Sequence, residues 1–223
     1  MAIKHFQKAV KIAPDYSHAW VGMADAYNLL GEPSKAKECY QKIVKITPKD
    51  ALTWSYKGMA YNELGKFKKA IICYQTAVEL DPEDASSWLS MGIIHAKQGE
   101  FNKALKTTQK AIDINPEYEV AWNTMGWIYR ELGEHKKALD CHHKAIKINP
   151  EDVDAWDNMG AVYIELGEFK KAIGCYKKAL EIAPRDVDAW INMGLTYEKM
   201  GYNNKADECF KKAIEIKPEL LKE

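Results

Sequence analysis

The one stretch whose residue types could bind a metal ion is "DCHHKAI", where Cys141, His142 and His143 follow one another. Thiolate and imidazole groups are the ligands that Zn²⁺ prefers in proteins. On a helix, however, only side chains three or four residues apart face one another, and consecutive side chains point in different directions. These three residues therefore cannot converge on one ion. The sequence predicts no metal site and no cofactor.

No other pattern indicates an enzyme. The chain has no glycine-rich phosphate loop, no metalloprotease helix motif and no nucleophile with a plausible base nearby. Its five cysteines recur at intervals of 34 residues or a multiple of 34: Cys39, Cys73, Cys141, Cys175 and Cys209. Equivalent positions on stacked helices are about 8–10 Å apart or more, whereas a disulfide needs α-carbons within about 7 Å. We expect five free, packed thiols and a reducing compartment, by default the cytoplasm.

Three residue types share this period of 34, which identifies an internal repeat. Prolines recur from Pro14 to Pro218 and glycines from Gly31 to Gly201. Tryptophan recurs at Trp20, Trp54, Trp88, Trp122, Trp156 and Trp190. With the tryptophan counted as position 4, the chain is a single array in which a half repeat (1–16) precedes the repeats 17–50, 51–84, 85–118, 119–152, 153–186 and 187–220.

Within each repeat the pattern predicts two helices. Positions 4, 7, 8 and 11 share one helix face, and positions 20, 24, 27 and 28 share another. Position 8 is Gly or Ala, position 20 is always Ala, and glycine follows the first helix, as is common where helices end. The proline and the acids after it suit the start of the next helix. A glycine inside a helix costs about 1 kcal/mol, so we expect the backbone of a facing helix to approach closely there.

The segments "WNTMGWIY", "AIICY" and "INP" resemble the signature of the tetratricopeptide repeat. The resemblance covers essentially the whole chain and implies an all-α fold, a right-handed superhelical solenoid of helical hairpins, with six full repeats plus an N-terminal half repeat. The sequence departs from the signature at Pro33, Lys57, His95, Thr108 and His142, where looser local packing is expected.

Trp127 is the one tryptophan outside this period, at position 9 of the fourth repeat. Positions 2, 5, 9 and 12 of a first helix share the face away from the periodic tryptophan. The resemblance implies that this face lines the concave groove where proteins of the family bind peptides. Trp127 is therefore predicted to point into the groove, and Trp122 into the core.

The same reasoning predicts a partner-binding surface with apolar groups in its middle and carboxylates toward its C-terminal end. Contiguous exposed apolar area of this kind usually has a partner. We expect a protein or peptide ligand with apolar anchors and a basic end that lies over Asp154, Asp157, Asp188 and Glu198. Alternatively, the curvature of the solenoid buries these side chains against neighbouring repeats. The predicted residues are Leu52, Met59, Leu89, Ile93, Val120, Asn123, Trp127, Arg130, Asp154, Asp157, Asn158, Ile164, Asp188, Ile191, Asn192 and Leu195.

Two binding modes of the family can be compared with this surface. The mode that clamps a terminal carboxylate uses a lysine at position 5, and no repeat of this chain has one. The mode that holds an extended peptide backbone uses a ladder of asparagines at position 6, and only Asn158 and Asn192 match it. Asparagine both donates to and accepts from a peptide backbone, so the chemistry suits two rungs of such a ladder.

Charge and hydropathy exclude other partners. The 32 basic and 32 acidic residues give a formal net charge of zero, so neither nucleic acid nor an anionic membrane surface is expected. No apolar run approaches the roughly 18 residues of a membrane span. The lysines at positions 19 and 26 are interpreted as a solvated convex surface.

Three functions remain open. The first is a non-enzymatic interaction scaffold that uses the groove. The second is a self-assembling array that associates end to end, because the last helix, with Ala206, Phe210 and Ala213, is as apolar as the interior ones. The third is a regulatory segment of a larger enzyme. The groove residues favour the scaffold.

Overall fold

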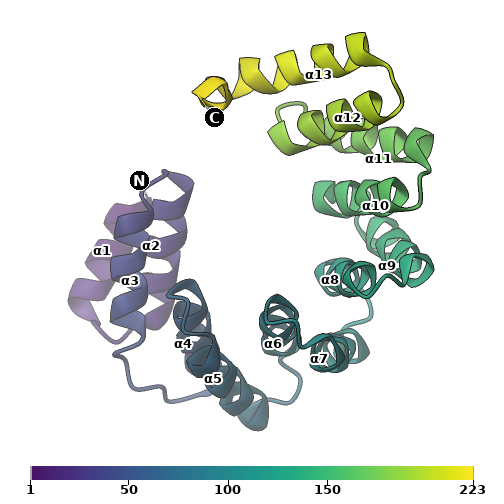
Figure 1. The fold of residues 1–223 in the computed structure, drawn as a ribbon. Coiled ribbons are helices and arrows are strands. Elements are labelled where there is room, and N and C mark those ends of the chain that lie inside the picture. The colour runs from purple at the N-terminus through teal and green to yellow at the C-terminus, as the bar shows by residue number, and fades with distance from the viewer. Residues whose placement is uncertain (1, 223) are drawn as a thin grey trace. The chain divides into compact units, whose positions relative to one another are not determined.

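The computed structural model describes residues 2–222, which form thirteen α-helices and a short 3₁₀-helix and contain no strand (Figure 1). The helices are α1 (Ala2–Ile12), α2 (Ser17–Leu29), α3 (Pro33–Ile43), α4 (Ala51–Glu63), α5 (Phe67–Leu80), α6 (Ala85–Lys97), α7 (Phe101–Ile114), α8 (Glu119–Glu131), α9 (His135–Ile148), α10 (Val153–Glu165), α11 (Phe169–Ile182), α12 (Val187–Lys199), α13 (Asn203–Ile216) and η1 (Pro218–Lys222).

The chain divides into two compact units, Met1–Pro116 and Glu117–Glu223. In the first unit, α2 pairs with α3, α4 with α5 and α6 with α7, while α1 packs against α2 as a half repeat. In the second unit the hairpins are α8–α9, α10–α11 and α12–α13. Within each unit, the second helix of one hairpin contacts the first helix of the next. The predicted all-α solenoid of helical hairpins is therefore confirmed, and the division falls at a proline between two repeats.

The predicted glycine stops are confirmed. All six glycines that follow a first helix have a positive φ of 70° to 78°, which only glycine adopts without strain. At the end of α4 the amide of Gly65 donates to the carbonyl of Asn62 (2.8 Å), and that of Lys66 donates to Tyr61 (2.8 Å). These two bonds satisfy carbonyls at the helix end that would otherwise lack a partner.

Several of the periodic tryptophans are hydrogen-bonded to the proline that precedes their helix. The indole N–H of Trp20 donates to the carbonyl of Pro14 at 2.9 Å, and Trp190 donates to Pro184 at 3.0 Å. Trp88 and Trp156 make the same bond six residues back. Each bond fixes the chain that enters a first helix against that helix.

A glycine of the first helix packs against the residue at position 24 of the second helix. A Cβ on Gly160 would lie 2.7 Å from the Tyr176 ring, and one on Gly194 would lie 2.6 Å from Phe210. The space that glycine leaves is therefore filled by a side chain, which corrects the expectation of a close backbone approach. Position 20, always alanine, is at most 1% exposed in all six hairpins.

The departures from the repeat signature do not open the core. Thr108 and His142 take the place of the Tyr or Phe found at position 24 in the other hairpins, and both are fully buried. Lys57 reaches the carbonyl of Ile46 with its ammonium group at 2.9 Å. His95 lies 2.6 Å from Glu100. Each substitution finds a packing or polar partner, so the looser packing expected at these positions is not seen at Thr108 or His142.

Two glycines of one hairpin give a matched test of this packing. Gly160→Ala should destabilise the protein by about 1–3 kcal/mol, because its methyl group overlaps a buried ring. Gly174→Ala in α11 should stabilise the protein by about 0.5–1 kcal/mol, because the added Cβ would meet no neighbouring side chain or facing backbone within 4 Å. Urea unfolding of the three proteins measures both changes. Equal effects of the two substitutions would contradict the packing argument.

Candidate functional site

In the first unit the predicted groove residues have unequal exposure. Leu52 is 57% exposed and Ile93 is half-buried. Met59 is half-buried and packs against two apolar clusters. Leu89 is only 3% exposed, so its prediction as a binding residue is wrong. Position 5 faces the neighbouring hairpin, as the bond from Ser87 to Ser55 (3.0 Å) shows, and an apolar residue there becomes part of the interior.

In the second unit the predicted surface includes a pocket of about 320 Å³. We call it the inner pocket. Four of its residues were predicted from the sequence: Arg130, Ile164, Asn192 and Leu195. They come from α8, α10 and α12, and Leu195 is 45% exposed. The complete lining is Arg130, Ala161, Ile164, Glu165, Tyr176, Asn192, Leu195, Thr196 and Lys199.

Arg130 forms the polar edge of this pocket. Its guanidinium group lies 2.8 Å from Glu131 and 3.5 Å from Glu165, and His135 lies 3.4 Å from Glu165. The Arg130 side chain is only 20% exposed, so the two carboxylates hold it in place. Because Glu131 and Glu165 already compensate the charge of Arg130, its guanidinium group is not free to bind an anion.

Asn123 and Asn158 are half-buried and hydrogen-bonded within the second unit. The Asn123 side-chain oxygen lies 2.8 Å from Nδ1 of His142 and accepts a second bond from the Asn158 amide at 3.3 Å. His142 is fully buried, and this burial lowers its pKa to about 3, so the ring is neutral and Nδ1–H is the donor. The Asn158 amide is therefore engaged inside the unit, which leaves Asn192 as the asparagine that lines the pocket.

A group of carboxylates lies near the start of α10 and α12. Asp154 and Asp188 are exposed, whereas Asp157 is half-buried and its Oδ1 has no hydrogen-bond partner among the described residues. Burial, with added repulsion from Asp186, Asp154 and Asp188, raises the pKa of Asp157 to about 7. We call Asp154, Asp157 and Asp188 the acidic patch.

The other predicted residues of the second unit lie on its first helices. Val120 is 42% exposed, and Ile191 is half-buried. Trp127 is half-buried on α8, so part of the indole is accessible. Its role in binding stays a prediction.

Ala161 lies on the predicted face of α10 but was not among the predicted binding residues, and sequence reasoning missed four further residues of the inner pocket: Glu165, Tyr176, Thr196 and Lys199. Tyr176 occupies a core position, so nothing in the repeat pattern indicates that it also lines the pocket. Glu165 was detectable. It follows Arg130 by 35 residues, and such a pair of opposite charges on neighbouring first helices indicates a contact.

The three side chains at the centre of the "DCHHKAI" stretch lie in different surroundings. Cys141 and His142 are buried, while His143 is exposed, with Nδ1 2.8 Å from the Leu139 carbonyl. Residues 2–222 contain no group of three potential ligands that could hold a metal ion. All five thiols are buried and free, and burial raises the pKa of Cys141 to about 11. Nor is any helix in this part of the chain long and apolar enough for a membrane crossing.

Comparison with known proteins identifies the family. Models described as tetratricopeptide repeat match residues 2–58, 85–118, 120–152, 144–174 and 187–220, and one described as TPR repeat matches 58–99 and 160–201. The chain belongs to the tetratricopeptide repeat family. Repeats of this family are generally non-enzymatic scaffolds. A comparison with curated protein sequences found no match.

Several solved structures share the fold. MamA is 30% identical, with a TM-score of 0.64 over 74% of this chain and 97% of its own. YrrB, described as a TPR protein with an unusual peptide-binding site, is 24% identical, with a TM-score of 0.59 over 83% and 95%. Cut9, solved in the APC/C hetero-tetramer Cut9–Hcn1, is 19% identical, with a TM-score of 0.78 over 96% of this tetratricopeptide chain and 42% of its own.

The raised pKa of Asp157 makes stability depend on pH. Between the ordinary value of 3.8 and about 7, the folded protein keeps a proton that the unfolded chain has lost. The contribution of Asp157 to stability is therefore full below about pH 4, falls as the pH rises through this window and is lowest above it. Asp157→Asn should remove that loss, which is at most about 4 kcal/mol at pH 8 and is reduced by solvent screening of this half-buried group, and should change little at pH 4.

Urea unfolding of both proteins from pH 4 to pH 8 measures this difference. Asp154→Asn, at an exposed neighbour, is the control and should have a much smaller effect. A difference between wild type and Asp157→Asn that stays constant with pH would show that Asp157 does not titrate in this range.

Proposed function

We propose that this tetratricopeptide repeat protein is an interaction scaffold whose second unit binds a peptide or helix in the inner pocket. The observation that carries the proposal is that positions 9 and 12 of consecutive first helices, with Asn192 at position 6, line one pocket. A concave, largely apolar pocket with a few polar groups at its edge is the usual form of a ligand site.

The pocket supplies the apolar anchor site. Ala161, Ile164 and Leu195 give it an apolar wall, while Asn192 lies beside them and can pair with a peptide backbone. Leu195, at 45% exposed, gains most from being covered. One apolar side chain of the ligand occupies this site.

The acidic patch supplies the site for the basic end. Asp157 and Ile164 are seven residues apart on α10, which corresponds to about 10 Å along the helix axis. An extended peptide spans that distance with about three residues. A cation placed beside Asp157 also offsets the cost of its buried, unpaired carboxylate oxygen. The ligand class is therefore an apolar residue with a lysine or arginine about three positions away.

Selection from a displayed peptide library tests the proposal. Peptides that bind the wild-type protein should carry this apolar–basic spacing. Their affinity should fall at least about tenfold for Leu195→Glu, because a carboxylate would face the apolar anchor. Ile148→Glu, at an exposed residue on the second helix α9, is the matched control and should bind normally. Peptides that bind both variants equally well would place the site elsewhere.

Trp127 provides a separate prediction. Trp127→Ala should weaken the selected peptides by about tenfold while the melting temperature changes by no more than a few degrees, because part of the indole is exposed. Calorimetric titration and thermal unfolding measure the two effects. A large drop in melting temperature with unchanged affinity would show that the Trp127 indole stabilises the fold and does not bind the peptide.

A further inference from the structure

Three second helices carry a tyrosine at position 24, and only one of the three hydroxyl groups lacks a partner. The side-chain amide of Asn28 donates to the Tyr40 hydroxyl at 3.0 Å. Tyr74 is hydrogen-bonded to Ser90, at position 6 of the next first helix. The hydroxyl group of Tyr176 has no hydrogen bond within the described part of the chain, although this residue is only 2% exposed. A tyrosine as buried as this usually finds a partner for its hydroxyl group.

The neighbours of Tyr176 explain why its hydroxyl group is left over. Position 12 of its hairpin, where Asn28 lies in the first repeat, is Ile164, which has no polar group. Position 6 of the next first helix is Asn192, which lines the inner pocket together with Tyr176. The side chain of Asn192 makes no hydrogen bond to any residue that the structure describes. Two polar side chains of the pocket therefore remain available to a ligand.

Asp157, at position 5 of the fifth repeat, lacks a partner for a similar reason. At the same position of the second repeat, Ser55 is bonded to Ser87 at 3.0 Å, and Ser87 is position 3 of the next first helix. After Asp157, position 3 of the next first helix is Ala189, which has no donor. The Oδ1 atom of Asp157 is buried and has no hydrogen-bond partner in residues 2–222.

These three side chains come from three helices of the second unit that pack together, since α11 contacts both α10 and α12 (Figure 1). A Cβ on Gly160, three residues after Asp157 on α10, would lie 2.8 Å from Cζ of Tyr176, the ring carbon that bears the hydroxyl group. Asp157 also shares a helix face with Ala161 of the inner pocket, four residues later. We call Asp157, Tyr176 and Asn192 the polar trio.

The charges around the polar trio favour a cation. Three further carboxylates act on Asp157, those of Asp186, Asp154 and Asp188. Arg130 lines the same pocket, but two carboxylates already hold its guanidinium group. Burial, and then the charge of Asp157, raise the pKa of Tyr176 well above its usual value, so its hydroxyl group keeps the proton and stays neutral.

We propose that the polar trio binds an arginine side chain of the peptide or helix that occupies the inner pocket. This proposal rests on the binding function proposed above and specifies which basic residue the ligand carries. The trio offers a carboxylate, a phenol oxygen and an amide oxygen, all of which accept hydrogen bonds. A guanidinium group has five N–H donors in a planar fork and is less strongly hydrated than the ammonium group of lysine. Arginine therefore satisfies several acceptors at once and loses less hydration.

Two peptides that differ in one residue test the proposal. Both carry the apolar–basic spacing described above, one with arginine and the other with lysine as the basic residue. Calorimetric titration of the full chain at pH 8, above the pKa of about 7 of Asp157, measures the two affinities. We expect the arginine peptide to bind at least about tenfold more tightly. Tyr176→Phe and Asp157→Asn should each reduce this preference to about twofold or less.

The two variants keep the packed ring and the side-chain volume, so the fold should be retained, and thermal unfolding checks this. Tyr74→Phe, at the same position of a hairpin in the first unit, is the matched control and should leave the preference for arginine unchanged. A preference that survives both Tyr176→Phe and Asp157→Asn would overturn the proposal.

Other outcomes separate this proposal from the binding function on which it rests. If both peptides bind wild type equally well and Leu195→Glu weakens both, the arginine site is wrong and the inner pocket remains the ligand site. If neither peptide binds, both proposals fail. Self-association of the free protein that Asp157→Asn abolishes would assign the polar trio to a second copy of the chain and overturn the proposal.

Discussion

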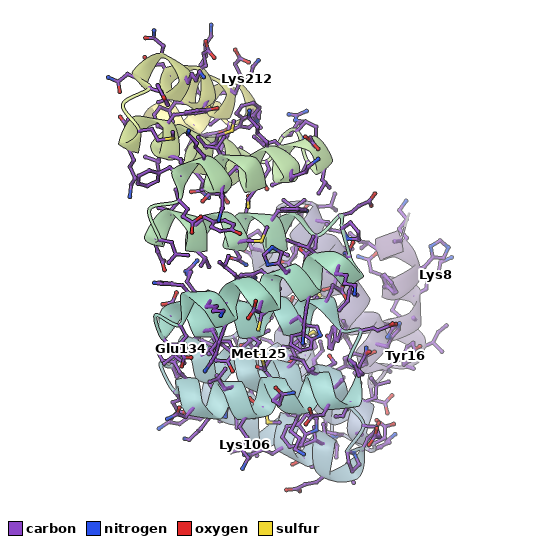
Figure 2. All side chains as sticks on the ribbon, turned by 90° about the vertical axis from the view of Figure 1, so that its right-hand side faces the viewer. Lys8, Tyr16, Lys106, Met125, Glu134 and Lys212 are labelled. Carbon is purple, nitrogen blue, oxygen red and sulfur yellow. The ribbon has the colours of Figure 1, made fainter. Side chains whose placement is uncertain are left out.

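The packing of the small residue at position 8 of a first helix, glycine in five of the six hairpins, against the side chain at position 24 is the contact on which the rest of the hairpin depends. With no Cβ on Gly160, the Tyr176 ring lies directly against the backbone of α10. This packing determines which side of the first helix faces the second helix of its hairpin. It therefore also determines which side of the first helix remains free to contact other partners. Met125 lies on the buried side of α8, and Glu134 lies in the turn between α8 and α9 (Figure 2). The exposed side carries Leu195 and its neighbours.

The side chain at position 24 varies more than the glycine does, and the variation has chemical consequences. Tyrosine and phenylalanine fill the slot with an apolar ring. His142 fills it with a ring that needs a hydrogen-bond partner, and Asn123 supplies one. This requirement in turn engages Asn158 from the next hairpin. One replacement in a packed slot thus determines the role of two asparagines that a sequence pattern assigns to a binding surface.

Features that recur in every repeat can be predicted from the sequence. Features that depend on the contact between neighbouring hairpins cannot. Helix order, glycine stops and the buried alanines follow from periodicity, because each repeats the same local geometry. The burial of Leu89 and the contribution of Tyr176 to the inner pocket do not, because positions 5, 6, 12 and 13 depend on how one hairpin sits on the next. The 34-residue pattern contains no information on that angle. Paired charges such as Arg130 and Glu165 are the exception, since their complementarity is visible in the sequence.

The hydrogen bonds that join Asn123, His142 and Asn158 mean that the repeats are not interchangeable modules. Gene duplication readily multiplies a 34-residue unit, and most contacts would tolerate a copy placed anywhere. A copy of the fourth repeat placed before a unit without asparagine at position 6 would leave Asn123 one bond short. The fourth and fifth repeats are therefore matched to each other by a contact that no other pair of neighbouring repeats can make with the same residues.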